Sequence, residues 1–227
     1  MTDDLTPSII IPWRDGGCPH RADALAIVVD WLEDVFPFAD LQLVDATPDG
    51  PWSRGQSIDL GVERAHRDLI LVADADMLTP ASQLYDALKA ATDSPGQVIP
   101  FDLYRYLSEP TTARLRAGWP LEEEAWVTLP AKFTMSTSVG GTMAITRSAY
   151  EAAGGHDPRF VGWGGQDYGF YFAADTLAGP MRRIAGPSVH LFHPTDPHRP
   201  PSNMDLMGRY SSASGDPDAM RELIAER

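Results

Sequence analysis

Positive charge is scarce in this chain. Its 227 residues include 18 Lys and Arg but 32 Asp and Glu, which gives a formal net charge of -14. Surfaces that bind the phosphates of nucleic acids broadly are built from Lys and Arg. The composition therefore argues against a protein whose main task is to bind nucleic acid, and leaves room only for a local basic groove.

Cysteine and long apolar segments are also scarce. Cys18 is the only cysteine, which excludes an internal disulfide and fits a reducing compartment. No apolar run approaches the ~20 residues that a membrane helix needs, and the acidic first residues do not resemble a signal peptide. We therefore expect a cytoplasmic protein without a membrane span.

The chain does have the apolar content of a sizeable core, at 43%. Short apolar runs and helical spacings alternate along the first hundred residues. They predict strands at 8–13, 41–45, 68–73 and 97–101, and helices at 22–36, 57–66 and 80–91. Strands that alternate with helices indicate a parallel sheet covered by helices on both faces. The length fits one α/β domain.

The second half is less regular. Residues 102–138 show a mixed pattern. The remaining predicted elements are a strand at 142–146 and helices at 147–153, 167–174 and 217–225. The tail after His193 is rich in Pro, Ser, Gly and Asp, so we expect a loop or flexible arm up to the last of these helices.

Two aspartates follow the strand predicted at 68–73. Asp74 and Asp76 would lie beyond the carboxyl end of that strand, where ligands bind in open α/β sheets. A departing diphosphate needs a cation to neutralise its charge, and carboxylate oxygens suit Mg²⁺ or Mn²⁺. The alternative is ordinary turn chemistry, since many turns carry two aspartates.

A second motif is Gly162-Trp163-Gly164-Gly165-Gln166-Asp167. Its glycines permit positive φ and a close approach of the backbone to a ligand. Trp163 offers an apolar face to a sugar ring, and Asp167 at the start of a helix could accept a proton from an attacking hydroxyl. The alternative is a turn in which Asp167 caps the helix and Trp163 belongs to the core.

Two histidines follow in His190-Leu191-Phe192-His193. Neutral imidazole binds Mn²⁺ and similar ions, although a single histidine of this kind is more often a packed or surface residue. Positions three apart face opposite sides of a regular strand, so His190 and His193 could share a metal only if the segment bends.

Taken together, these residues resemble GT-A-fold glycosyltransferases. Residues 8–76 resemble the nucleotide-sugar-binding half of glycosyltransferase family 2. The stretch from Gly140 through Asp167 is similar to the C-terminal half of β-1,4-galactosyltransferase-like enzymes, and residues 52–61 resemble a Phe-Asn-Arg motif of that group. The Gly-Trp-Gly-Gly motif is the most specific part.

The resemblance implies a fold and a division of the chain. The fold would be a GT-A (Rossmann-like), mostly parallel central sheet flanked by helices in a single α/β domain. Residues 8–101 would form the nucleotide-sugar-binding half, 102–195 the acceptor and catalytic half, and 196–227 a C-terminal arm.

The resemblance also implies roles on the donor side. Pro12 and Arg14 would line the nucleotide pocket at the end of the first strand. Asp45 would contact the uridine portion, and Arg54 would approach the donor. Asp74 would hold the ribose or a metal-bound water.

Further roles concern the metal and the acceptor. Asp76 would bind the metal directly, His193 lies where the family places a metal-binding histidine, and His190 where some members carry a second one. Asp167 matches the catalytic base of inverting members. Trp163, beside Gly164, would form the floor under a sugar.

The implied activity is transfer of a hexose, with inversion, from a nucleotide-sugar to an acceptor hydroxyl. The cofactor would be Mn²⁺ or Mg²⁺ and the donor a UDP-sugar, with GDP-sugars left open. The acceptor could be a glycan, a small molecule or a modified nucleobase. Gln166 and Tyr168 stand where the family has acids, and Asp59 where it has Asn, so the resemblance leaves the donor sugar open.

Two other functions fit the sequence less well. A sugar-phosphate nucleotidyltransferase would carry a Gly-rich loop with Lys after the first strand, and residues 12–17 contain no Lys. A non-catalytic sugar-binding scaffold would not need both Asp76 and Asp167. Release of free UDP from a UDP-sugar would exclude the scaffold.

Overall fold

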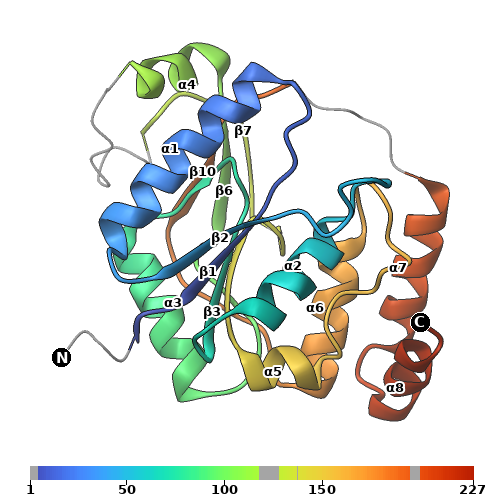
Figure 1. The fold of residues 1–227 in the computed structure, drawn as a ribbon. Coiled ribbons are helices and arrows are strands. Elements are labelled where there is room, and N and C mark those ends of the chain that lie inside the picture. The colour runs from blue at the N-terminus through green and yellow to red at the C-terminus, as the bar shows by residue number, and fades with distance from the viewer. Residues whose placement is uncertain (1–4, 118–127, 137, 195–199) are drawn as a thin grey trace.

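The computed structural model describes residues 5–117, 128–136, 138–194 and 200–227. The first part of the chain alternates strands and helices (Figure 1). It comprises β1 (Ser8–Pro12), α1 (Pro19–Val35), β2 (Asp40–Val44), α2 (Arg54–Arg64), β3 (Leu69–Ala73), β4 (Met77–Leu78), α3 (Ala81–Asp93) and β5 (Val98–Ile99). No helix within these described ranges combines the length and apolar character needed to cross a bilayer.

The second part mixes short strands with helices. It comprises β6 (Leu103–Leu107), α4 (Glu109–Arg116), β7 (Ala131–Met135), β8 (Thr142–Thr146), α5 (Arg147–Ala152), α6 (Gln166–Leu177), β9 (Arg182–Arg183), β10 (Pro187–His190), α7 (Pro201–Ala213) and α8 (Pro217–Ala225). The strand predicted at 142–146 is confirmed with the same bounds.

The larger sheet has six strands in the order β2-β1-β3-β8-β5-β9. β1 is parallel to both β2 and β3, as the alternating pattern predicts. β8 is antiparallel to β3 and to β5, whereas β9 is parallel to β5, so the sheet is mostly parallel as predicted. Between β5 and β8 the chain forms β6, α4 and β7, and β8 then runs opposite to both of its neighbours.

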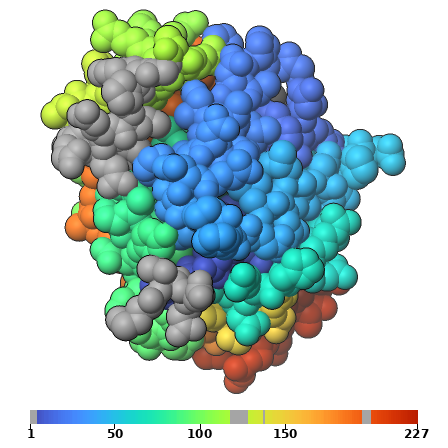
Figure 2. Space-filling view, turned by 60° about the vertical axis from the view of Figure 1, so that its left-hand side comes forward, coloured from blue at the N-terminus to red at the C-terminus, as the bar shows by residue number. Residues whose placement is uncertain are grey.

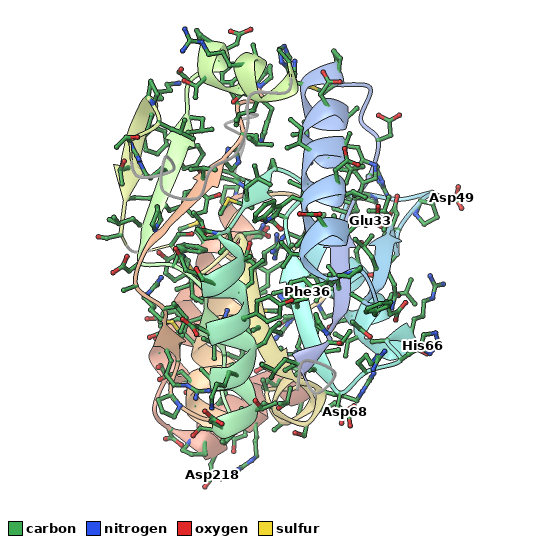
Figure 3. The ribbon with its side chains drawn as sticks, turned by 90° about the vertical axis from the view of Figure 1, so that its left-hand side faces the viewer. Glu33, Phe36, Asp49, His66, Asp68 and Asp218 are labelled. Atoms are coloured by element: carbon green, nitrogen blue, oxygen red, sulfur yellow. The ribbon has the colours of Figure 1, made fainter. Side chains whose placement is uncertain are left out.

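The strands of this sheet are covered on both faces. Along β1, Ile9 and Ile11 pack with α1 and α3, whereas Ile10 packs with α2 and α6. Figure 1 shows these helices on opposite sides of the sheet, and Figure 2 views the side that α1 covers. At the end of α1, Phe36 points toward α3 (Figure 3), where its ring lies 5.0 Å from that of Tyr85. Burial on both faces explains the continuous apolar run of β1.

A second sheet of four strands, β4-β10-β6-β7, was not predicted. β10 is antiparallel to the two-residue strand β4 and parallel to β6. In the first of these pairs, His190 lies opposite Met77 and Val189 opposite Leu78. This pairing joins the segment after the two aspartates to the segment that carries the two histidines.

The expectation of a flexible arm after His193 is wrong for residues 201–213, which form α7. The helix begins at the second of two prolines and contains Ser and Gly, so its local signal is weak. It forms because Leu206, Tyr210 and Ala213 are buried in a cluster with α6 and α8. Tertiary packing of one apolar face stabilises such a helix more than propensity does.

Candidate active site

Asp76, His190 and His193 form a cluster, here called the histidine cluster. The Nε2 atom of His193 lies 3.0 Å from Oδ2 of Asp76, and Nε2 of His190 lies 3.5 Å from Oδ1. One ligand atom from each residue lies within 4.8 Å of the others. The backbone N–H of Leu191 donates to the carbonyl of Asp76 at 2.8 Å, which fixes the two segments side by side.

The two histidines reach the same carboxylate because the strand ends between them. β10 stops at His190, and residues 191–194 leave the extended ladder. The two imidazole rings then lie with their centroids 5.0 Å apart. This is the bend that the spacing of three residues requires.

Burial and charge set opposite pKa shifts in this cluster. Burial favours the neutral form of Asp76, but His190 and His193 outweigh it and lower the pKa of Asp76 to about 2. Burial lowers the pKa of His190, which keeps its imidazole neutral. A hydrogen bond with Asp76 raises the pKa of His193. An ionised carboxylate beside imidazole nitrogens is a suitable ligand set for a divalent cation.

Arg54, Asp74 and Asp167 form a second cluster, here called the arginine cluster. Arg54 Nε donates to Asp74 at 2.7 Å, and its Nη1 donates to Asp167 at 2.6 Å. Arg54 is the first residue of α2, Asp74 follows β3, and Asp167 lies in the first turn of α6. One guanidinium therefore bridges two carboxylates that are far apart in the sequence.

Burial and neighbouring charges also shift pKa values in the arginine cluster. Burial, with the charges of Asp76 and Asp167, outweighs Arg54 and raises the pKa of Asp74 to about 7. Burial lowers the pKa of Arg54, but the charges of Asp167, Asp74 and Asp76 outweigh it and raise that pKa above its ordinary value. Asp74 and Asp76 are two residues apart in the segment that follows β3, so the two clusters are adjacent.

Two glycines leave the space that Asp167 and its neighbours occupy. A Cβ atom on Gly140 would lie 2.6 Å from Asp167 Oδ2. Gly141 has φ +105°, and a Cβ there would lie 3.0 Å from the ring of Tyr104. The carbonyl of Gly141 accepts a 2.7 Å hydrogen bond from the backbone N–H of Asp74. A larger residue at Gly140 would displace the Asp167 carboxylate.

The glycine-rich motif adopts the backbone that its composition predicts. Gly162, Gly164 and Gly165 all have positive φ. Trp163 is 50% exposed, so it is not a core residue. Gly165 rather than Asp167 is the N-cap of α6, and the Asp167 carboxylate points to Arg54 instead of capping the helix. Both structural alternatives for this motif are therefore wrong.

The residues predicted for the nucleotide pocket lie at the ends of β1 and β2. Pro12 ends β1 opposite Val44. Arg14 donates to both oxygens of Asp45, at 2.7 and 2.8 Å, and its guanidinium carbon lies 5.4 Å from the ring centroid of Trp52. A paired Arg and carboxylate beside an aromatic ring is a rigid, polar platform.

The departures from the family pattern lie close to this site. Gln166 is buried and Tyr168 is partly exposed in the first turn of α6. Asp59 accepts hydrogen bonds from Tyr150 Oη at 2.5 Å and from the backbone N–H of His156 at 2.9 Å. Burial raises the pKa of Asp59. Through these bonds, Asp59 joins α2 to α5 and to the segment that follows it.

Sequence reasoning missed three residues near the site. The ring of Tyr106 packs 4.4 Å from that of His190. Arg21 lies over Trp13, and its charge helps lower the pKa of Asp76. Asn203 of α7 bonds to the glycine-rich motif. None of the three belongs to a short motif, so only spatial proximity identifies them.

Comparisons with known proteins concern the fold and one segment of the sequence. Residues 127–184 match the family model described as the N-terminal domain of galactosyltransferase. A comparison with curated proteins finds no match. The catalytic domain of Drosophila β1,4-galactosyltransferase 7, in complex with xylobiose, is 15% identical with a TM-score of 0.56, covering 90% of this chain and 80% of that chain.

Two further crystal structures are similar. A variant of the Drosophila enzyme in complex with manganese, UDP-Gal and xylobiose is 15% identical with a TM-score of 0.57, covering 89% of this chain and 79% of that one. Glucosyl-3-phosphoglycerate synthase from Mycobacterium tuberculosis, in complex with Mn²⁺ and UDP-glucose, is 14% identical with a TM-score of 0.51, covering 92% and 77%. The chain therefore has the GT-A fold of these glycosyltransferases and resembles galactosyltransferases in sequence over residues 127–184.

Proposed function

We propose that this protein is a metal-dependent, inverting glycosyltransferase that moves a hexose from a UDP-sugar to an acceptor hydroxyl. One observation carries the proposal: the histidine cluster and the arginine cluster, built from distant segments, meet at one site of a GT-A fold. Two of the similar structures contain manganese together with a UDP-sugar, which supports the choice of donor class.

The histidine cluster fits a divalent cation. One carboxylate and two imidazoles converge within 4.8 Å; the carboxylate would suit Mn²⁺ or Mg²⁺, and the two imidazoles favour a transition-metal ion such as Mn²⁺. Asp76, His190 and His193 would hold the ion. A cation bound there would supply positive charge against the departing diphosphate.

The arginine cluster supplies the acid–base chemistry. Asp167 would accept the proton of the acceptor hydroxyl, and Arg54 holds the Asp167 carboxylate in a defined orientation. Asp74 anchors the other side of Arg54 and would face the ribose of the donor. Positioning of the two substrates would supply most of the rate, with the base contributing on the order of 10²–10⁴-fold.

The remaining predicted residues surround these clusters. Arg14 and Asp45, joined to each other, would bind the uracil end of the donor. Exposed Trp163, beside Gly164 with its positive φ, would contact a sugar ring. The acceptor is a hydroxyl compound, either a glycan or a small molecule, and the acidic net charge disfavours a nucleobase in DNA.

The test is a panel of UDP- and GDP-sugars incubated with the purified protein in the presence of Mn²⁺, Mg²⁺ or EDTA. We expect UDP release from at least one UDP-sugar, and loss of that release with EDTA. Release of UDP also excludes a non-catalytic scaffold. Absence of nucleotide release from every donor, in a folded protein that still binds UDP, would contradict the proposal.

A further inference from the structure

Asn203 is the only asparagine in the chain, and it lies buried in the first turn of α7 with 1% exposure. Among the residues that the structure describes, its side chain bonds to the backbone of Val161 and Gly164. Oδ1 accepts from the N–H of Val161 at 3.3 Å, and Nδ2 donates to the carbonyls of Val161 and Gly164, each at 3.0 Å.

This arrangement requires a carboxamide. Both N–H donors of the amide and its oxygen are used, so the side chain satisfies its own polar groups and three of the loop. A carboxylate of the same shape has no donors and would face two carbonyl oxygens in a buried space. A hydrocarbon side chain would leave the same three backbone groups without partners.

The loop needs such a partner because its backbone lacks regular pairing. Its three glycines have positive φ, and residues 161–165 belong to no helix or strand. On the side facing α2, the N–H of Gly162 donates to the carbonyl of Trp52 at 3.1 Å. On the side facing α7, Asn203 supplies the bonds. A Cβ on Gly165 would lie 3.0 Å from the Asn203 carbonyl, so loop and helix are in close contact.

The position of the loop sets the position of the proposed base. Gly165 is the N-cap of α6, and the N–H of Gly169 donates to its carbonyl at 2.9 Å. Asp167 lies between them and reaches Arg54 at 2.6 Å. Figure 1 shows α7 running beside α6. A shift of the loop therefore moves both Trp163 and Asp167.

We infer that Asn203 is a positioning residue for the reaction: it holds loop 161–165 so that Trp163 and Asp167 face the donor. This inference rests on the proposed function for its catalytic part. Asn203 follows His193 by ten residues in the sequence, so a proposed metal ligand and the residue that bonds to the loop are close neighbours in the sequence. No ligand-binding motif would have pointed to this residue.

The test compares Asn203→Asp and Asn203→Ala with Tyr210→Phe. Tyr210 is a matched control because it lies buried on the same helix and donates one hydrogen bond, to Asp157 at 2.9 Å, rather than to residues 161–165. Hydrogen–deuterium exchange of residues 160–166 and UDP release from the best donor with Mn²⁺ are measured for each variant. Calorimetry with UDP and Mn²⁺ measures nucleotide affinity.

We expect exchange in the loop to accelerate about tenfold in both Asn203 variants, with β1 unchanged. UDP release should fall at least about tenfold, while affinity for UDP and Mn²⁺ stays within about twofold because its ligands lie on other elements. Tyr210→Phe should lower the melting temperature but leave both the exchange of the loop and the release of UDP unchanged. Wild-type loop exchange in both Asn203 variants would overturn the inference. If the wild-type protein releases no UDP, the proposed function fails, and loop exchange alone decides the role of Asn203.

Discussion

The two clusters of the site are built from different kinds of structure. The histidine cluster joins the ends of paired strands: Asp76 precedes β4, His190 ends β10, and a backbone hydrogen bond from Leu191 to Asp76 fastens them. The arginine cluster joins two helix starts and a loop, through the side chain of Arg54 alone. A backbone hydrogen bond and a strand pair therefore position the histidine cluster, whereas the guanidinium of Arg54 positions the arginine cluster.

This difference suggests separate tasks for the two clusters: donor binding for the histidine cluster and turnover for the arginine cluster. Ligands fastened by a strand pair keep their geometry when a neighbouring side chain changes. Carboxylates held by a single arginine depend on that side chain and on the glycine loop beside it. We therefore expect changes in the histidine cluster to remove donor binding, and changes in the arginine cluster to spare binding but reduce turnover.

The largest effect is expected from Asp76→Ala. The variant loses the only carboxylate of the histidine cluster, so Mn²⁺-dependent binding of a UDP-sugar should fall at least about 10²-fold. Calorimetry with and without Mn²⁺ measures this, and Asp218→Ala, an exposed acid at the far end of the molecule (Figure 3), is the control. Unchanged metal-dependent binding would remove Asp76 from the metal site.

Asp167→Asn tests the other side of the comparison. The amide keeps the shape of the side chain but cannot act as a base, so turnover should fall on the order of 10²–10⁴-fold. Donor affinity should stay within about twofold. Steady-state UDP release and calorimetry on the same preparation separate the two quantities, and full turnover would show that the base is elsewhere.

Arg54→Lys tests whether turnover needs the guanidinium that bridges Asp74 and Asp167. Lysine keeps the charge but lacks the planar fork that reaches Asp74 and Asp167 at once. We expect turnover to fall about 10- to 100-fold, with a smaller loss of donor affinity. Equal losses of affinity and turnover would contradict the division between the clusters.

Gly140→Ala should give a smaller loss of turnover, because it changes only the position of the Asp167 carboxylate. The new methyl group would lie 2.6 Å from Asp167 Oδ2, so the carboxylate must turn away from Arg54. Turnover should fall about tenfold. Gly208→Ala, where nothing lies within 4 Å of the added carbon, is the matched control and should leave turnover unchanged.

Asp157→Asn should change neither cluster. Asp157 accepts from Arg159 at 2.6 Å and from Tyr210 at 2.9 Å, and the second bond ties α7 to the chain before the glycine loop. Removal of the buried carboxylate should lower the free energy of unfolding by about 2 kcal/mol. Urea titration measures this, and donor affinity of the folded variant serves as the comparison.

The same aspartate predicts a pH dependence of stability. Burial favours its neutral form, but the hydrogen bonds from Arg159 and Tyr210 outweigh burial and lower the pKa of Asp157 below its ordinary value. The stabilisation is complete above about pH 4 and is lost as pH falls through the lowered pKa. The difference between wild type and Asp157→Asn should therefore shrink in acid. A difference that grew in acid would contradict this assignment.

Much of the fold could be predicted because its signals are local. The apolar run of β1 and the bounds of β8 follow from burial of consecutive residues on both faces of a sheet. The antiparallel direction of β8, the second sheet and α7 could not be predicted in this way. Each depends on which distant segment it packs against, and α7 carries no strong helix signal of its own.

The sequence by itself determined which chemical groups this protein carries: two aspartates after a strand, a glycine-rich motif before an aspartate, and two histidines three apart. Only the tertiary structure decided that His190 and His193 meet one carboxylate, that Arg54 joins Asp74 to Asp167, and that Asn203 holds the loop. The physical reason is range. Strand and helix signals act between near neighbours in the chain, whereas hydrogen bonds and ion pairs between distant residues form only after the sheets and helices have packed.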